Sequence, residues 1–184
     1  MHNRRMPVTR VRPATLADTE GIGLVHVRSW QSAYRGKMPQ DHLDGLDPAD
    51  RAEAWGRVIA ETDPTRGGVL AAVAKGGGII GFASFGPSRD SDTDPRRTGE
   101  VFAIYADPEV WGTGTGRSLM AGAVAELVRL GYADAILWVL DTNDRARRFY
   151  VRAGWAEDGA SKTDGSRGFD ITEVRYRRRL VRCV

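Results

Sequence analysis

Three glycines alternate with two threonines in the stretch VWGTGTGRSLM, which runs from Val110 to Met120 and then turns apolar without a break. Glycine inside a helix costs up to about 1 kcal/mol relative to alanine, so three of them at the start of a helix need an explanation. A glycine-rich turn before a helix leaves backbone N–H groups free at the end where the helix dipole places about half a positive charge. We therefore expect this turn to bind an anion such as a phosphate.

The spacing of the glycines differs from that of two common phosphate-binding loops. The ATP-binding loop requires G-x-x-x-x-G-K-[ST], whereas this chain has Arg117 and Ser118 after its last glycine. The dinucleotide fingerprint G-x-G-x-x-G would require a glycine in place of Arg117. On these residues alone, a turn with a purely structural role stays open beside the anion site.

A second group of residues with chemical potential is the stretch NDRARRFYVRAGW at 143–155. Asn143 is a favourable helix N-cap, and an apolar face follows it. Together the two stretches resemble the GCN5-related N-acetyltransferases. The W-x-x-G-x-G pattern at 111–116 is similar to the pyrophosphate loop of that family, and the N-x-x-A-x-x-F-Y-x-x-x-G-W pattern at 143–155 is similar to its second block. Trp111 stands where the family often has Arg or Gln, and Trp155 where it usually has Phe.

The resemblance implies a mixed-sheet α/β fold in which two central parallel strands, 101–106 and 135–140, splay apart around the pantetheine arm of acetyl-CoA. Acetyl-CoA is the expected cosubstrate, bound by main-chain groups of the first strand, by the glycine turn and by the second block. The residues expected to contact it are Ile104, Tyr105, Ala106, Trp111, Gly112, Thr113, Gly114, Thr115, Gly116, Arg117, Asn143, Ala146 and Tyr150.

The resemblance also implies roles for individual side chains in moving an acetyl group to a primary amine. Tyr150 matches the tyrosine that protonates the departing sulfur, although an aromatic on this helix face could also be a core residue. Glu100 matches a position used as a base, directly or through water; the alternative is a carboxylate facing solvent. Trp30 and Tyr34 share a helix face that would line the acceptor cleft. The acceptor is expected to be a small-molecule or peptide amine.

Two other functions compete with this reading. A non-catalytic acyl-CoA-binding domain would not need both Tyr150 and Glu100. A nucleic-acid-binding tail is suggested by the C-terminal arginines, but alternation places Arg175, Arg177 and Arg179 on one strand face, which indicates a solvated sheet edge or a dimer contact. We expect no nucleic-acid partner.

Composition sets the remaining limits. The 184 residues, 41% hydrophobic with net charge +3, suit a single domain, 1–184. The basicity comes from 24 arginines against 3 lysines, which codon bias would explain. No apolar run predicts a membrane span or a secretory signal. The one cysteine, Cys183, excludes an internal disulfide and favours the cytoplasm. His2, His26 and His42 lack metal-ligand spacing, so no metal is expected, and the chain is expected to be a monomer or a homodimer.

Periodicity predicts the elements that position these residues. Thr15 and Asp18 have the spacing of a capping box at a helix start, and KGGG reads as the turn of a hairpin. The expected elements are a strand within 8–15 that includes Val8 and Val11, helices over 16–34 and 48–60, strands 69–74 and 79–86, a loop over 87–97, a strand over 99–108, a helix ending at Gly131, a strand over 135–140, a helix over 143–154 and a last strand within 169–180. The central strand–turn–helix–strand order implies a parallel pair with a right-handed crossover.

Overall fold

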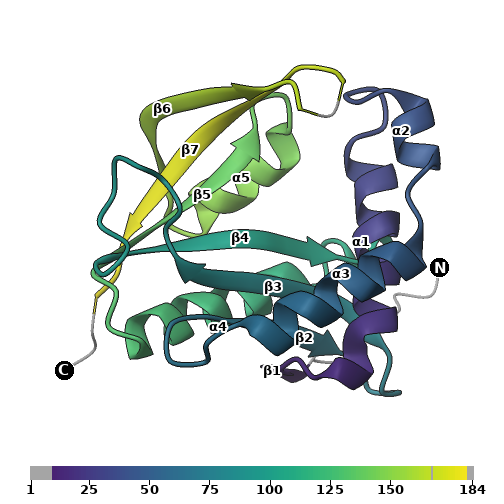
Figure 1. Ribbon diagram of the computed structural model, residues 1–184, viewed down its shortest axis with the longest axis horizontal. Helices are drawn as coiled ribbons and strands as arrows, with labels where there is room; N and C mark the ends of the chain where they lie inside the picture. Colours follow the sequence, from purple (N-terminus) through teal and green to yellow (C-terminus); the bar gives the residue numbers. More distant parts are fainter. Residues whose placement is uncertain (1–9, 167, 182–184) are drawn as a thin grey trace.

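One mixed sheet organises the computed structural model, which describes residues 10–166 and 168–181 (Figure 1). The strand order is β1 (Arg10–Pro13), β2 (Gly68–Val73), β3 (Ile79–Pro87), β4 (Thr98–Ala106), β5 (Asp134–Leu140), β7 (Ile171–Arg179) and β6 (Ala156–Asp164). The strands β4 and β5 pair in parallel, and the other neighbours pair antiparallel. The predicted mixed α/β sheet is confirmed.

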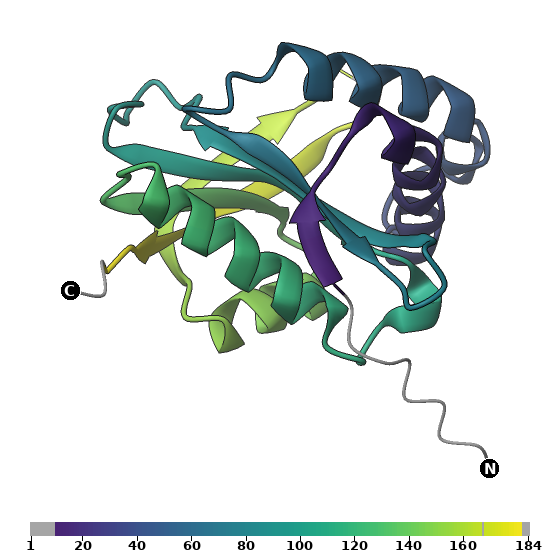
Figure 2. The ribbon, with the colours of Figure 1, turned by 90° about the horizontal axis from the view of Figure 1, so that it is seen from below.

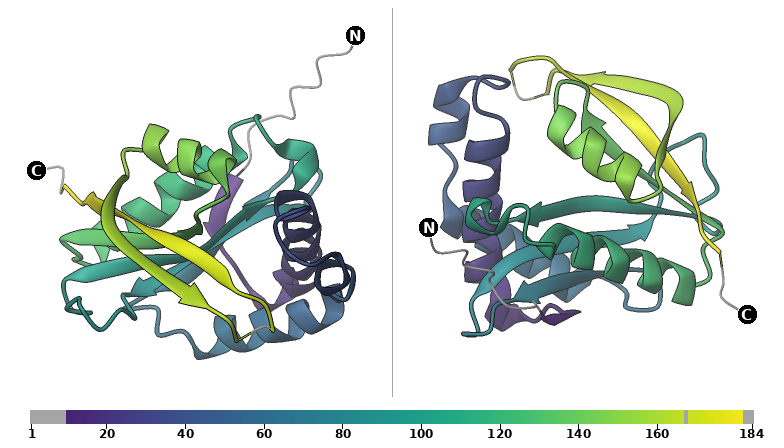
Figure 3. Two further views of the ribbon diagram at one scale, coloured as in Figure 1. Left: turned by 90° about the horizontal axis from the view of Figure 1, so that it is seen from above. Right: turned by 180° about the vertical axis from the view of Figure 1, so that it is seen from behind.

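Helices cover both faces of this sheet. Figure 2 shows α3 (Pro48–Glu61) on the side opposite to α4 (Thr115–Arg129), and the rear view in Figure 3 shows α4 and α5 (Asp144–Arg152) together on the near face. The helix α1 (Thr19–Ala33) packs against α3 and against β3 and β4. Its apolar residues join Phe82 of β3 in one core cluster, and α4 and α5 enclose a larger cluster on the other face.

Local sequence explains where most of these helices begin. Thr15 donates its amide and its hydroxyl to the Asp18 carboxylate at 2.8 and 3.0 Å, so the predicted capping box is confirmed. The predicted helix 16–34 is divided, however, into a 3-10 turn, η1 (Leu16–Asp18), followed by α1. The helix α3 is capped by Asp47, whose carboxylate accepts the amide of Ala49 at 2.7 Å.

Several elements differ from the sequence prediction. The short helix α2 (Gln40–Asp44), the turn η2 (Pro108–Val110) and the strand β6 were not predicted. Nearly every residue of β6 is exposed, so this strand lacks the alternation that reveals a half-buried strand. The first strand is confirmed over β1, whereas Val8, His2 and Cys183 lie outside the described residues.

The strands β4 and β5 diverge soon after they meet. Their pairing extends only from Thr98–Asp134 to Glu100–Ile136, although both strands continue further. On its other side β4 carries a bulge, because Ser84 pairs with Ala103 and Phe85 with Val101, which leaves Phe102 as an extra residue that bends the strand. Figure 1 shows the two strands separating toward α1. The predicted splay of the central strands is confirmed.

The position of β7 corrects the interpretation of the C-terminal arginines. This strand lies between β5 and β6, so it is not a sheet edge. The Arg175 side chain is only 7% exposed and binds aspartates from other segments, and Arg177 donates to Asp134 at 2.6 Å and to Asp158 at 3.2 Å. The prediction of a solvated edge was wrong because β6, which the sequence did not reveal, covers that side.

The close packing of α1 on α3 predicts opposite effects on stability when two helical glycines, Gly23 and Gly56, are replaced by alanine. A Cβ on Gly23 would lie 2.3 Å from the Pro48 carbonyl oxygen and 2.8 Å from the Ala52 nitrogen, whereas a Cβ on Gly56 would meet only a methyl of Thr19 at 3.7 Å. We expect Gly23→Ala to lower the free energy of unfolding by about 2 kcal/mol, because overpacking outweighs the helix propensity of alanine. Gly56→Ala should raise it by about 0.5 kcal/mol. Urea denaturation measures both, and equal stability of the two variants would contradict this account.

Candidate active site

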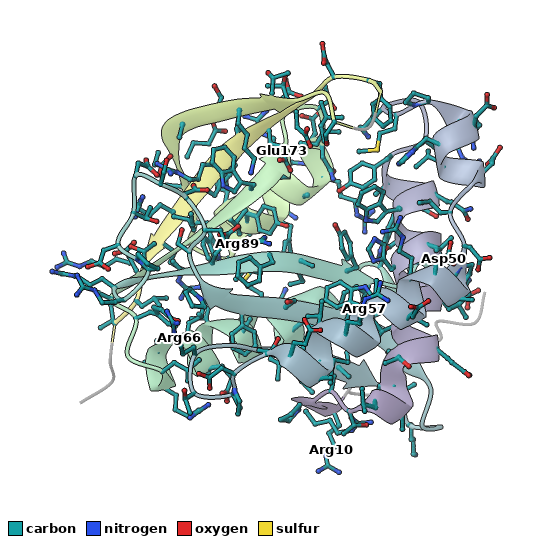
Figure 4. All side chains as sticks on the ribbon, viewed as in Figure 1. Arg10, Asp50, Arg57, Arg66, Arg89 and Glu173 are labelled. Atoms are coloured by element: carbon teal, nitrogen blue, oxygen red, sulfur yellow. The ribbon has the colours of Figure 1, made fainter. Side chains whose placement is uncertain are left out.

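The divergence of β4 and β5 opens a cleft of about 890 Å³. The glycine turn and the start of α5 line one part of it, and the end of α1 with β7 and β6 lines another. In Figure 4 the labelled Glu173 of β7 lies above the opening between the strands, and the labelled Arg89 lies closer to the end where the strands meet. The cleft therefore joins a main-chain-rich end to an end lined by aromatic and charged side chains.

The glycine turn presents backbone rather than side chains. Gly112 and Gly114 have φ values of 82° and 101°, a left-handed conformation that glycine adopts without strain. A Cβ at either position would meet nothing within 4 Å, so conformation rather than crowding requires these glycines. The Ser118 amide donates to the Gly114 carbonyl at 3.0 Å, which leaves the amides of 115–117 ahead of the hydrogen-bond ladder of α4. This geometry suits an anion.

The hydroxyls of the two threonines between the glycines make contacts within the turn. The Thr113 hydroxyl donates to the Val110 carbonyl at 2.7 Å and lies 3.1 Å from the Thr115 hydroxyl. Thr115 is buried. A Cβ added to Gly116 would lie 3.6 Å from the Phe149 ring, which is an ordinary van der Waals contact. The turn thus offers amides to a ligand while its hydroxyls bond within the turn.

Trp111 connects this turn to β4. Its indole N–H donates to the Ala106 carbonyl at 2.8 Å, and the guanidinium of Arg145 lies 4.2 Å from the ring centroid. The Ala106 carbonyl, expected to bind the coenzyme, therefore already has one donor. The predicted Arg117 lines the cleft together with Arg145 and Arg148, which were not predicted from the sequence. Their spacing of three residues on one helix was the available signal.

Tyr150 lies on α5 at the wall of the cleft and is 8% exposed. Its ring packs edge-on against Phe149 at 5.4 Å and near Tyr176 at 6.0 Å. Burial, with a smaller contribution from the neighbouring Tyr105, raises the pKa of Tyr150 well above its ordinary value of 10.0, so the phenol keeps its proton at neutral pH. A phenol held in this form is a proton donor.

Asn143 caps the helix that carries Tyr150. Its side-chain oxygen accepts the Ala146 amide at 3.2 Å, which confirms the predicted N-cap. Both residues line the cleft, and Asn143 is buried. The cap therefore fixes the start of α5 directly beside the space that a ligand would enter.

Glu100 is the last residue of β4 that pairs with β5, and it is 5% exposed at the wall of the cleft. Its carboxylate accepts the backbone amide of Arg89 at 2.9 Å, and the Arg89 guanidinium lies 3.6 Å away. Burial raises the pKa of Glu100, and the hydrogen bond and charge from Arg89 oppose that rise without cancelling it. The solvent-facing alternative for Glu100 does not hold, because the carboxylate lies in the cleft wall.

The other end of the cleft is rich in aromatic side chains. Trp30 and Tyr34 meet edge-to-face at 5.1 Å, are half-buried, and line the cleft while packing on the core. Phe102, Trp138, Lys162 and Glu173 also line the cleft and were not predicted. Lys162 pairs with Glu173 at 3.5 Å and lies 4.0 Å above the Trp138 ring. The position of Trp138 between the buried Leu137 and Val139 could have indicated that it faces the opposite side.

Within residues 10–166 and 168–181, no group of three or more His, Cys, Asp or Glu side chains could hold a metal ion. None of the helices in those same ranges combines the length and the apolar character needed to cross a bilayer.

The buried Glu100 carboxyl makes a prediction about stability and pH. Because its pKa is raised in the folded state, its contribution to stability is complete below the unfolded pKa and is lost as pH rises through the folded pKa. The stability of Glu100→Gln relative to wild type should therefore increase between pH 4 and pH 7. Glu157→Gln is the control with the opposite sign, since hydrogen bonds from Arg147 and Tyr176 lower the pKa of Glu157. Chemical denaturation across pH measures both, and parallel trends would contradict the assignment.

The comparisons with known proteins agree with this geometry. The model of the Acetyltransferase (GNAT) family matches residues 27–155. An uncharacterized N-acetyltransferase, YuaI, of Bacillus subtilis is 34% identical over 133 residues, which cover 72% of each chain. A mycothiol acetyltransferase of Propionibacterium freudenreichii is 33% identical over 161 residues, 82% of this chain but 48% of that protein.

Solved structures show the same fold. The PaiA N-acetyltransferase of Thermoplasma acidophilum, crystallised with coenzyme A, superposes with a TM-score of 0.71 at 19% identity and covers 93% of this chain and 98% of that one. The family match extends from α1 to the end of α5 and includes both the glycine turn and the capped helix. The predicted family is confirmed: this chain belongs to the GNAT family of acetyltransferases, enzymes that use acetyl-CoA as cosubstrate.

Proposed function

We propose that this chain, as a single domain over 1–184, moves an acetyl group from acetyl-CoA directly to a primary amine of a small-molecule or peptide acceptor. The observation that carries the proposal is the cleft between the diverging strands, which has the glycine turn at one end and both Glu100 and Tyr150 in its walls. The two strands therefore frame a space with an anion site, a buried carboxylate and a protonated phenol.

The residues present fit the coenzyme. Acetyl-CoA supplies an acetyl group activated as a thioester. The amides of 115–117 and the cations Arg117, Arg145 and Arg148 bind its diphosphate end. The edge of β4 at Ile104 offers main-chain groups to the pantetheine amides, as in strand addition. The Ala106 carbonyl keeps its second lone pair for the same purpose while the Trp111 indole occupies the first.

Glu100 and Tyr150 handle the two protons. A primary amine resembling lysine has a pKa of about 10.4 in water, so it must lose a proton before it can attack. Glu100 accepts that proton directly or through a water molecule. Tyr150, protonated because it is buried, donates to the departing sulfur. Trp30 and Tyr34 contact the body of the acceptor.

The Tyr150 phenol gives the decisive experiment. Tyr150→Phe should lower kcat by about a hundredfold, because a positioned general acid contributes 10²–10⁴-fold. The Kd of acetyl-CoA should change less than about twofold, since the ring stays in place. Release of free coenzyme A thiol with a panel of primary amines measures turnover, and calorimetry measures binding. Tyr132→Phe is the matched control, because that hydroxyl bonds the Arg66 carbonyl at 2.7 Å outside the cleft. Wild-type turnover in Tyr150→Phe, or no thiol release by the wild type, would refute the proposal.

The glycine turn gives a second prediction. Gly114→Ala forces an L-residue to a φ of 101°, which should displace the amides of the turn and raise the Kd of acetyl-CoA by about tenfold, equivalent to 1.4 kcal/mol. Gly77→Ala is the control, because Gly77 also has a positive φ, 89°, but lies in the hairpin turn between β2 and β3 and does not line the cleft. Equal affinity of the two variants for acetyl-CoA would show that the turn does not bind the diphosphate.

A further inference from the structure

Arg175 on β7 gathers three carboxylates from two distant segments. Its Nε donates to Asp158 of β6 at 2.8 Å. One terminal nitrogen donates to Asp90 at 2.8 Å, and both terminal nitrogens hold Asp92 at 2.7 and 2.8 Å. The Arg175 side chain is 7% exposed, so these bonds form largely out of water. Asp90 and Asp92 belong to the loop between β3 and β4, which is thereby anchored to the far half of the sheet.

The same loop contacts Glu100 on its other side. Residue 89 precedes the anchored Asp90, and its amide donates to the Glu100 carboxylate at 2.9 Å. The Arg89 guanidinium lies 3.9 Å from the centre of the Phe102 ring and 3.6 Å from Glu100. The loop also closes on itself, since the Thr93 hydroxyl donates to the Asp90 carbonyl at 2.9 Å and lies 2.8 Å from the Ser88 hydroxyl. Residues 90–92 are therefore joined by a short hydrogen-bonded loop to the amide that binds Glu100.

The Asp90 carboxylate, which Arg175 binds, also contacts Trp138 of β5. Its indole N–H lies 3.1 Å from both oxygens of Asp90, the carboxylate that Arg175 binds. Trp138 and Arg175 are also direct neighbours in the register of β5 and β7. Arg175 and the aspartates that it binds are thus linked to two parts of the cleft lining. One link runs through Arg89 to Glu100, and the other runs through Asp90 to Trp138.

We propose that Arg175 is a positioning residue for acetyl transfer: by binding Asp90 and Asp92 it fixes the 88–94 loop, and so holds the Arg89 amide on the Glu100 carboxylate and the Trp138 indole in the cleft. The catalytic consequence rests on the proposed role of Glu100 as the base, whereas the positioning itself does not. The groups whose charge acts on Glu100 are Arg89 and Lys162, which favour its ionised form, and Asp90, which opposes it.

Two aspartates of one loop provide a matched test. Asp92→Asn weakens the Arg175 anchor at a carboxylate that is 59% exposed, so the variant should fold. Asp94→Asn removes the same charge from the same loop, but within the described residues the Asp94 carboxylate binds only the exposed Arg96. Removal of a negative charge by itself lowers the pKa of a neighbouring carboxyl. Loss of the Arg89 amide bond raises it, so the two effects have opposite signs.

The readout is the titration of Glu100, followed by carbon-13 NMR of its carboxyl group in the unliganded protein. We expect Asp92→Asn to raise the Glu100 pKa by roughly 0.5–1 unit, a three- to tenfold change in proton affinity, and Asp94→Asn to leave it unchanged or slightly lowered. Arg175→Lys, which keeps the charge but loses the planar fork, should raise it further. If Arg175→Lys does not fold, the aspartate pair decides alone. An unchanged pKa in Asp92→Asn, or the same shift in both aspartate variants, would overturn the proposal.

Activity separates this inference from the proposed function. The acid limb of kcat/KM against pH should move by the same amount as the titration in Asp92→Asn, with the Kd of acetyl-CoA unchanged. If the carboxyl titration moves and the rate profile does not, Glu100 is not the base, and the positioning by Arg175 stands. If neither moves, the positioning fails whatever the base is.

Discussion

The brief pairing of two parallel strands is the constraint on which the rest of this structure depends. After Glu100 and Ile136 the main chains of β4 and β5 separate, so backbone groups that a continuous sheet would satisfy face a cleft instead. Buried backbone groups need partners, and one of them, the Ala106 carbonyl, takes the Trp111 indole. The bulge at Phe102 bends β4 away, and α1 and α2 close the open end through a cluster that includes Leu140 and Ile171.

The cleft has buried ionisable side chains in one part of its wall and arginines in another. Glu100 and Tyr150 are both removed from water, and in both cases desolvation raises the pKa. The effect differs in its chemical consequence, because it makes the carboxylate a stronger base and keeps the phenol a donor. Three other cations, Arg117, Arg145 and Arg148, lie on α4 and α5 beside the glycine turn, where we propose that they bind the diphosphate. The fold thus separates the proposed diphosphate site from the side chains that we propose as base and acid, Glu100 and Tyr150.

Much of this arrangement could be predicted from the sequence, where local spacing determines the outcome. The positive φ at Gly112 and Gly114, the Asn143 cap and the parallel strands each follow from a short pattern. The Arg175 anchor could not be predicted in this way, because Asp92 lies 83 residues away in the chain and no periodicity links them. The strand β6 was missed for a different reason, since its exposed residues carry no alternating pattern, and without it β7 was mistaken for an edge.

The two edge strands of the sheet, β1 and β6, affect whether two molecules of this protein can associate edge to edge. Unpaired strand edges invite a neighbouring chain to extend the sheet, which leads to aggregation. Here β1 is short and ends at Pro13, and β6 is interrupted by an irregularity between Glu157 and Ser161 and carries Lys162 at an exposed position. Short length, proline, charge and broken register are the usual means of blunting an edge. An enzyme whose sheet must part in its middle is thus protected against growing at its ends.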